Sequence, residues 1–263
     1  MQLVAGAGLI AASSRSAPPA SVVRPHTIDA VLAALADCPD PVLVAGGTHL
    51  CAEYLTGRRP GTLVALDRVR GLGEIAIEPG MLRIGALVTH EAGPKHPLLR
   101  THLPEFADAW AMIANTRVRG WASIGGNLMA RHTRYELSLL LSALQAQLVC
   151  LTPSGATQRL SPAEMWETQT PCLLHHVAIP LREGHAFSYR RELRPVVTVA
   201  VCRDATGARA AIATEYRRPV LLTDASIDTL PDDFADPVSS AWYLRRAGAV
   251  LLGRGRADVG LHG

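Results

Sequence analysis

Two pairs of adjacent glycines constrain this chain more than any other feature of its sequence. Gly46 and Gly47 end a short apolar run, and Gly125 and Gly126 stand far downstream in the run Ala-Ser-Ile-Gly-Gly-Asn. Glycine has no Cβ, so the backbone at each pair can approach a ligand closely and turn its N–H groups toward one point. Such concavities favour anions. One pair alone is typical of an ordinary strand-to-helix turn, but two in matching contexts predict a diphosphate held from both sides by main-chain donors.

Composition indicates a soluble globular protein. The chain has 263 residues, of which 48% are hydrophobic and 19% charged, enough for one large domain or two ordinary ones. The net charge of +3 is too balanced to indicate a nucleic-acid or membrane surface. The five scattered cysteines show no metal-ligand spacing, so we expect no metal site and a cytoplasmic protein with reduced thiols.

The N-terminal residues partly resemble two known sequence patterns, a dinucleotide-binding fingerprint and a signal peptide. Residues 6–11, Gly-Ala-Gly-Leu-Ile-Ala, partly fit the glycine fingerprint of a dinucleotide-binding unit, but the strand before it and the helix after it are missing. The same stretch lacks the basic start of a signal peptide. We therefore expect residues 1–20 to be a flexible tail or the product of an early start codon.

The next section has the pattern of a small α/β layer. Thr27 can cap a helix whose apolar positions 28, 31, 32 and 35 lie on one face. Short buried strands are expected at 42–45 and 62–66, with a helix at 50–55 between them. This alternation predicts parallel strands.

The pattern then becomes antiparallel. Two alternating runs, 74–77 and 81–84, flank the turn sequence Glu-Pro-Gly and predict a hairpin. Amphipathic helices are expected at 104–115 and 137–144, and strands at 149–152, 157–160 and 173–179.

The last section predicts three strands, at 187–191, 196–201 and 208–213, before a final helix. The residues of that helix region expected to face inward are Val238, Ala241, Trp242, Leu244, Val250 and Leu251.

Several of these segments together carry a family resemblance. They are Val-Arg-Pro at 23–25, Leu-Val-Ala-Gly-Gly-Thr at 43–48, Leu-Arg-Ile-Gly-Ala-Leu-Val-Thr-His at 82–90, Arg-Val-Arg at 117–119 leading into Ala-Ser-Ile-Gly-Gly-Asn-Leu at 122–128, and Val-Ala-Ile-Pro at 177–180. In this order the chain from about residue 22 onward resembles the flavoprotein subunit of the molybdenum hydroxylases, the family of xanthine dehydrogenase and carbon monoxide dehydrogenase. The segments at 82–86 and 123–127 are specific as a pair, whereas either alone is weak.

The resemblance implies an α+β fold that binds FAD. A small α/β layer, residues 21–73, and a larger antiparallel α+β subdomain, residues 74–182, would form the FAD-binding domain. FAD would lie extended between them, with its pyrophosphate bound by main-chain N–H groups of both glycine loops. Residues 183–263 would form a C-terminal domain with a three-stranded sheet and a helix.

The resemblance also implies the residues of the site. Ile113 falls near the adenine side, Leu174 near the flavin ring, Glu136 where an aspartate usually contacts the cofactor, and Arg190 about where some relatives have lysine. No catalytic or metal-binding residue is expected in this chain. The full cofactor-binding set is Leu43, Val44, Ala45, Gly46, Gly47, Thr48, His49, Leu50, Ile113, Ser123, Ile124, Gly125, Gly126, Asn127, Glu136, Leu174 and Arg190.

Some positions depart from the family pattern. His49 stands where Asp, Ser or Glu is common, and residues 132–136 replace the usual Ser-Pro-Ala-Ala-Asp run. We expect His49 to be a loop residue rather than a covalent flavin link. Glu136 could instead simply start the helix at 137–144, because acidic side chains favour helix N-termini.

The implied partners are a molybdopterin-binding large subunit and a two-cluster iron–sulfur small subunit. This chain would take electrons from the clusters and pass them to an external acceptor. Two alternatives stay open: a stand-alone flavoenzyme acting on a small molecule, suggested by the altered residues 132–136, and a structural subunit without flavin.

Overall fold

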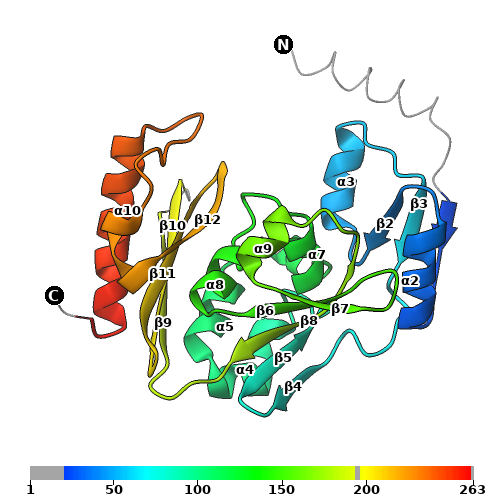
Figure 1. Cartoon of the computed structure of the whole chain (residues 1–263), viewed down its shortest axis with the longest axis horizontal. Helices are drawn as coiled ribbons and strands as arrows, with labels where there is room; N and C mark the ends of the chain where they lie inside the picture. Colours follow the sequence, from blue (N-terminus) through cyan, green and yellow to red (C-terminus); the bar gives the residue numbers. More distant parts are fainter. Residues whose placement is uncertain (1–20, 193–195, 262–263) are drawn as a thin grey trace.

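The computed structural model describes residues 21–192 and 196–261, so the expectations for residues 1–20 lie outside the described residues. The chain forms three sheets, of three, five and four strands, which follow one another along the sequence (Figure 1). No helix in the described ranges is long and apolar enough to cross a bilayer.

The first sheet is parallel, as the sequence predicts. Its strands β1 (Ser21–Val23), β2 (Pro41–Val44) and β3 (Thr62–Ala65) lie in the order β1-β3-β2. Strand β1 was not predicted, because three residues are too few to show an alternating pattern.

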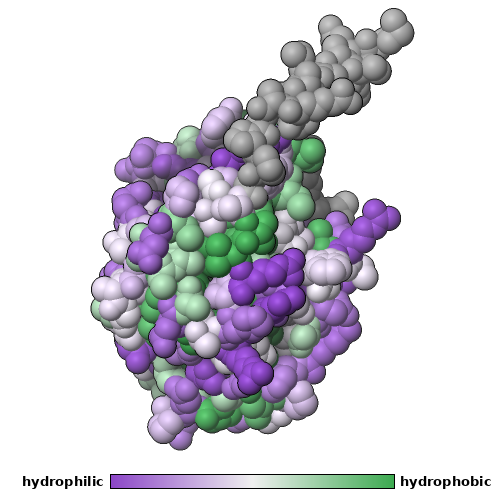
Figure 2. Space-filling model, turned by 90° about the vertical axis from the view of Figure 1, so that its right-hand side faces the viewer, coloured by the Kyte–Doolittle hydropathy of each residue, from purple (hydrophilic) through white to green (hydrophobic). Residues whose placement is uncertain are grey.

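Two helices accompany this sheet. Helix α2 (Ile28–Asp37) begins where predicted, since the Thr27 hydroxyl accepts a hydrogen bond from the Ala30 N–H at 3.2 Å. Helix α3 (Thr48–Leu55) starts directly after Gly47, two residues earlier than the apolar pattern indicates. Figure 2 views the molecule from the side of this layer and shows apolar areas separated by hydrophilic residues.

The second sheet is antiparallel and has the strand order β4-β5-β8-β6-β7. The predicted hairpin is confirmed as β4 (Ile75–Glu78) and β5 (Met81–Gly85). The other strands are β6 (Gln147–Leu151), β7 (Thr157–Leu160) and β8 (Leu173–Pro180), and the helices of this section are η1 (Gly93–Lys95), α4 (Pro97–His102), α5 (Pro104–Ala111), α6 (Thr116–Arg119), α7 (Ile124–Met129), α8 (Leu137–Ala143) and α9 (Pro162–Glu167).

The third sheet has four antiparallel strands, so the expectation of three strands is wrong. The missed strand is β12 (Arg217–Leu222), which pairs with β11. Its Arg-Arg-Pro start does not have a strand-like pattern, but proline is tolerated on edge strands, and β12 lies at the sheet edge. The sheet order is β12-β11-β10-β9, with β9 (Ala186–Arg191), β10 (Val197–Asp204) and β11 (Gly207–Thr214), and the short helices η2 (Thr223–Ala225) and η3 (Ile227–Thr229) follow.

Helix α10 (Ala241–Asp258) covers one face of the third sheet (Figure 1). Leu244 and Leu251 are buried as predicted, but Trp242 and Val250 are exposed, as is Val238, which precedes the helix. The helix begins only at residue 241, capped by the Ser240 hydroxyl, and its inner face carries glycines as well as leucines. A Cβ on Gly248 or Gly255 would lie 2.6 Å or 2.7 Å from a side chain of the sheet, so α10 packs closely through its glycines.

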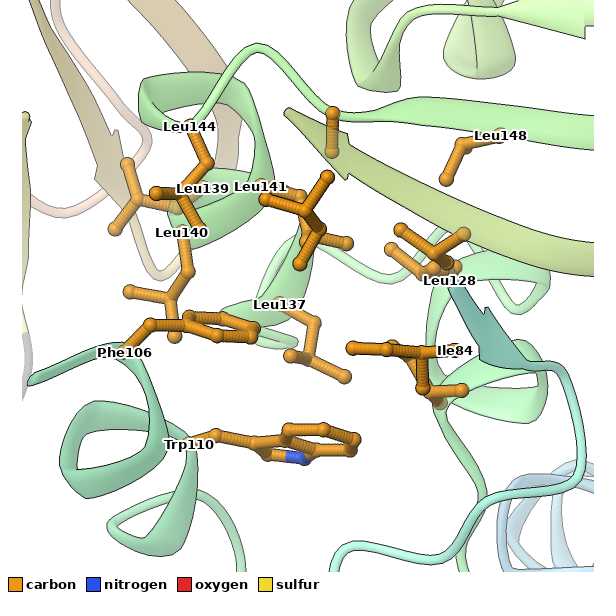
Figure 3. Packing of buried hydrophobic residues seen from close by; sticks show 14 of the residues in the cluster. Ile84, Phe106, Trp110, Leu128, Leu137, Leu139, Leu140, Leu141, Leu144 and Leu148 are labelled. Atoms are coloured by element: carbon orange, nitrogen blue, oxygen red, sulfur yellow. The ribbon is translucent and has the colours of Figure 1, made fainter. Parts of the chain in front are cut away.

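The opposite face of the third sheet packs against the second section through the largest core. Helix α8 lies at its centre, with Leu137, Leu140 and Leu141 fully buried near Phe106 and Trp110 (Figure 3). The same cluster includes Phe187 of β9 and Ala211 of β11. The third sheet is therefore joined to the second section by a shared hydrophobic core.

A buried ion pair adds a polar link between these sections. Arg209 of β11 donates from Nε to the Ala143 carbonyl at the end of α8, 2.9 Å away, and pairs with Asp204. The side chains are 9% and 1% exposed. Burial alone would raise the pKa of Asp204, but hydrogen bonds from Arg209 and Thr206 lower this pKa well below its ordinary value.

We predict that Asp204→Asn destabilises the fold by about 3 kcal/mol or more, because it leaves the Arg209 charge buried without its carboxylate. Since the folded-state pKa of Asp204 is depressed, its contribution is present above the unfolded-state pKa of about 4 and is lost as pH falls. Urea unfolding between acid and neutral pH measures both effects. Asp108→Asn, which removes an exposed partner of Arg100, is the control and should cost less than about 1 kcal/mol. Equal losses in the two variants would contradict a structural role for the buried pair.

Candidate functional site

A cavity of about 650 Å³ lies between the first and second sections of the chain. Its walls come from the β2–α3 loop, the segment from Ile113 to Val118, the second glycine loop with the residues after it, and the start of β8. This volume is typical of sites that enclose a small molecule or cofactor.

The two glycine loops meet at this cavity. A Cβ built on Gly46 would lie 1.8 Å from the carbonyl oxygen of Trp121, so only glycine permits this approach of the two backbones. Trp121 directly precedes the second loop, whose residues Ser123 and Gly126 line the same cavity. The structure thus brings together two segments separated by more than seventy residues.

The first loop offers free main-chain donors. Gly47 has a left-handed φ of 68° and precedes α3, whose N-terminus has no side-chain cap. The N–H groups of Gly47, Thr48 and His49 donate to no acceptor in the part of the chain that the structure describes. An uncapped helix N-terminus that lines a cavity favours a bound anion.

The second loop differs in part from this expectation, because most of its main-chain donors are already used and, among the described residues 123–127, only the Ser123 N–H is left without an acceptor. The Ile124 N–H donates to the Val88 carbonyl and the Gly125 N–H to the Ala86 carbonyl, both at 2.9 Å. Gly126 donates to the Ser123 hydroxyl at 3.1 Å. A Cβ on Gly125 would lie 2.7 Å from the Ala86 oxygen, so the second glycine pair serves close packing against the chain after β5.

Three buried polar atoms on cavity-lining residues have no hydrogen-bond partner within residues 21–192 and 196–261. They are Nε2 of His90, Oδ1 of Asn127 and Nε of Arg131. These three atoms have almost no accessible surface, so they lie behind the cavity wall and do not by themselves indicate a ligand.

The charged residues of the wall leave one cation available. Arg58 pairs with Glu53 at 3.2 Å, and Arg134 pairs with Glu215 at 2.8 Å. Arg131 has no carboxylate partner among the described residues. Its guanidinium therefore adds positive charge to the cavity, which also suits an anion.

The residues that depart from the family pattern lie together at the wall. His49 Nδ1 is 3.0 Å from the Tyr135 hydroxyl, and His49 Nε2 is 3.7 Å from a Glu53 oxygen. The His132 ring stacks on Tyr135 with centroids 4.9 Å apart. Burial, and then the charge of Glu53, raises the pKa of Tyr135, so its phenol keeps its proton at neutral pH.

Glu136 lines the cavity and is held by strand β9. Its carboxylate accepts hydrogen bonds from the Tyr189 hydroxyl and, at 3.3 Å, from Arg191. Arg190 points the other way and donates to Asp258 of α10 at 2.7 Å, because successive strand residues face opposite sides. The structure therefore does not bring the predicted Arg190 to the cavity and places Arg191 against Glu136 instead.

Most of the predicted site residues line the cavity, and two do not. The side chain of Arg190, on β9, binds Asp258 of α10 instead, and Ile124 is fully buried in the core. The analysis of the sequence missed His90 and Arg131 as candidates, although His90 closes the motif at 82–90. The predicted residues that line the cavity are Leu43, Val44, Ala45, Gly46, Gly47, Thr48, His49, Leu50, Ile113, Ser123, Gly125, Gly126, Asn127, Glu136 and Leu174.

Fold and cavity define an α+β protein whose first two sections form a cavity that suits an anionic ligand. Residues 17–181 match the family described as the FAD binding domain in molybdopterin dehydrogenase. This match covers more than half of the chain, and the chain therefore belongs to that family.

Curated relatives agree with this assignment. The chain is 26% identical over 167 residues to the caffeine dehydrogenase subunit beta of Pseudomonas sp. (strain CBB1), covering 60% of this chain and 57% of the relative. It is 30% identical over 126 residues to the carbon monoxide dehydrogenase medium chain of Hydrogenophaga pseudoflava, covering 48% and 43%. The matches thus span about half the length of these relatives.

Solved structures show the same fold. Carbon monoxide dehydrogenase from Hydrogenophaga pseudoflava superposes with a TM-score of 0.83 at 19% identity, covering 92% of this chain and 97% of that one. Quinoline 2-oxidoreductase from Pseudomonas putida 86 gives a TM-score of 0.81 at 21% identity, covering 93% and 99%. The α+β fold expected from the sequence is confirmed.

We predict that Gly46→Ala separates the two loops and weakens FAD binding about tenfold or more, because its methyl group overlaps the Trp121 carbonyl. Flavin fluorescence quenching measures the dissociation constant. Gly73→Ala is the matched control, since no atom lies within 4 Å of its Cβ position. Unchanged FAD affinity in a folded Gly46→Ala protein would show that the backbone contact does not shape the site.

Proposed function

We propose that this chain is the FAD-binding electron-transfer subunit of a molybdenum-containing hydroxylase or dehydrogenase. It would take electrons from iron–sulfur clusters on a partner chain and pass them to an external acceptor. The observation that carries the proposal is the cavity beneath the uncapped start of α3, in a chain of the FAD-binding family of molybdopterin dehydrogenases. Its relatives, a dehydrogenase subunit beta and a dehydrogenase medium chain, support it.

The residues of the cavity fit FAD. The free N–H groups of Gly47, Thr48 and His49 would bind the diphosphate, and the unpaired Arg131 would help to neutralise it. When bound, FAD supplies the centre that accepts and releases electrons. The task of the protein is to position this group and exclude water.

Both ring systems of FAD need apolar walls, and the cavity offers them. Leu43, Ile113 and Leu174 line it, and Ile113 and Leu174 are buried. Glu136 is fixed in direction by Tyr189 and Arg191, which leaves its second carboxylate oxygen for a cofactor donor. These contacts make a precise flavin orientation possible without any catalytic side chain in this chain.

Because this chain would supply only the flavin site, the other redox centres would belong to partner subunits. Substrate oxidation would take place at a molybdopterin-binding large subunit, and a small subunit with two iron–sulfur clusters would carry electrons to FAD. The relatives are named as a subunit and a medium chain, which supports a multi-subunit assembly.

One observation favours a second candidate, a flavoenzyme that acts directly on a small molecule. Tyr135, His49 and Glu53 form a phenol–imidazole–carboxylate series at the cavity wall, a type of arrangement that can move protons. The isolated chain would then reduce its own flavin with a small substrate. If the chain is an electron-transfer subunit, flavin reduction by the substrate requires the partner chains.

We predict that the chain purified with its partner subunits is yellow and releases stoichiometric FAD on heating, because the free N–H groups at the start of α3 and the apolar cavity walls suit a dinucleotide. Chromatography of the released flavin separates FAD from FMN, and metal analysis of the complex measures molybdenum and iron. A correctly folded complex without flavin would overturn the proposal and favour a structural subunit.

A further inference from the structure

Two buried cysteines lie close together at the wall of the cavity, and the proposed function uses neither of them. Cys150 belongs to β6, and Cys172 directly precedes the neighbouring strand β8 (Figure 1). Cys150 is 0% exposed, whereas Cys172 is 6% exposed and lines the cavity. Of the two residues, only Cys172 therefore offers surface to a small reagent.

The register of the two strands puts both side chains on one face of the sheet. Cys150 pairs with Leu174, and Cys172 stands two residues before Leu174, so the three side chains share a face. All three belong to the main hydrophobic core. The two thiols lie within hydrogen-bonding reach of each other and are not joined by a disulfide.

The surroundings make Cys172 the more reactive of the two thiols. The hydrogen bond from Cys150 lowers the pKa of the Cys172 thiol, burial opposes this effect, and the charge of Arg131 adds to it. The same hydrogen bond, together with burial, raises the pKa of Cys150, which keeps its proton. Because the thiolate is the nucleophilic form of cysteine, Cys172 can react first and Cys150 can follow.

The backbone at Cys172 can adapt to a disulfide. Diagonal neighbours on adjacent strands have Cα atoms about 7–8 Å apart, slightly more than the roughly 4.4–6.8 Å that a disulfide requires. Cys172 lies before the first ladder pair of β8, Leu173 with Leu151, and neither its N–H nor its carbonyl is hydrogen-bonded within the described part of the chain. A small shift of this segment is therefore enough to close the bond.

We propose that Cys172 and Cys150 form a redox-active pair at the cavity wall, which hydrogen peroxide converts to a disulfide. In the first step the Cys172 thiolate attacks one oxygen of peroxide, the O–O bond breaks, and a sulfenic acid and hydroxide form; the hydroxide takes up the proton that the Cys172 thiol released. In the second step the Cys150 thiol attacks the Cys172 sulfur, the S–S bond forms, and the hydroxyl group leaves with the Cys150 proton as water. The two thiols lose two electrons and two protons, and peroxide becomes two molecules of water.

The position of Cys172 links this oxidation to the occupancy of the cavity. Residues 169–171, which precede Cys172, line the cavity as well. A bound FAD would cover this segment, so the pair is oxidised chiefly while the cavity is empty. The formation of the disulfide does not depend on the proposed FAD site, whereas its protection by FAD rests on that site.

Peptide mass spectrometry of the full chain, freed of flavin and treated with hydrogen peroxide in the dark, tests the proposal. The wild-type chain should yield two peptides joined through Cys150 and Cys172, and dithiothreitol should reverse the change. FAD at about ten times its dissociation constant leaves about a tenth of the cavities empty and should slow the reaction about tenfold. Cys202, a buried cysteine of β10, is the internal control and should stay reduced.

Two variants separate the steps of the reaction. Cys150→Ala should let Cys172 stop at the sulfenic acid, which dimedone traps, whereas Cys172→Ala should leave Cys150 as a thiol. The wild-type reaction decides the matter even if a variant fails to fold. A wild-type chain that keeps both thiols in peroxide, or that joins either of them to a different cysteine, would overturn the proposal.

The outcomes also separate this proposal from the proposed function. Oxidation at an unchanged rate in the presence of bound FAD would show that Cys172 is not reached through the cavity, and the link to cavity occupancy would fail while the FAD site stands. If the chain binds no FAD, the proposed function fails, and the peroxide reaction without FAD still decides whether the two cysteines are a redox-active pair.

Discussion

The direct approach of two backbone segments, Gly46 against the Trp121 carbonyl, is the constraint on which the rest of the site depends. It joins the small parallel layer to the antiparallel section at the wall of the cavity between them. The contact also leaves the start of α3 facing that cavity without a cap. A helix N-terminus needs partners for its free N–H groups, and an anionic ligand is the partner that this geometry offers. The site therefore depends first on a glycine, Gly46, whose missing side chain lets the two backbone segments meet.

The C-terminal section takes part in the site although none of its described residues, 183–192 and 196–261, line the cavity. Tyr189 and Arg191 of β9 fix the carboxylate of Glu136, and Arg209 of β11 holds the end of the helix that Glu136 precedes. The four-stranded sheet thus supports the cavity wall through α8. A partly buried carboxylate with two donors on one oxygen has a defined direction, which is what a bound flavin requires of its neighbours.

Local patterns predicted the fold well where periodicity and turn chemistry were strong. The Thr27 cap, the hairpin around Pro79 and the buried face of α8 appear as expected. The failures at the site share a physical cause, which is dependence on partners distant in sequence. The phase of a strand decides whether Arg190 or Arg191 reaches Glu136, and the carbonyls of Ala86 and Val88 accept the hydrogen bonds of two N–H groups in the second loop. Likewise, the hydrogen bond from the Trp110 indole to His90 joins two residues whose contact no local pattern reveals.

A crystal structure of the chain with bound FAD tests the central claim most directly. The account predicts diphosphate oxygens at about 2.7–3.2 Å from the N–H groups of the Gly47–His49 turn, with Gly46 still packed against Trp121. A diphosphate bound elsewhere, with the start of α3 facing only solvent, would contradict it.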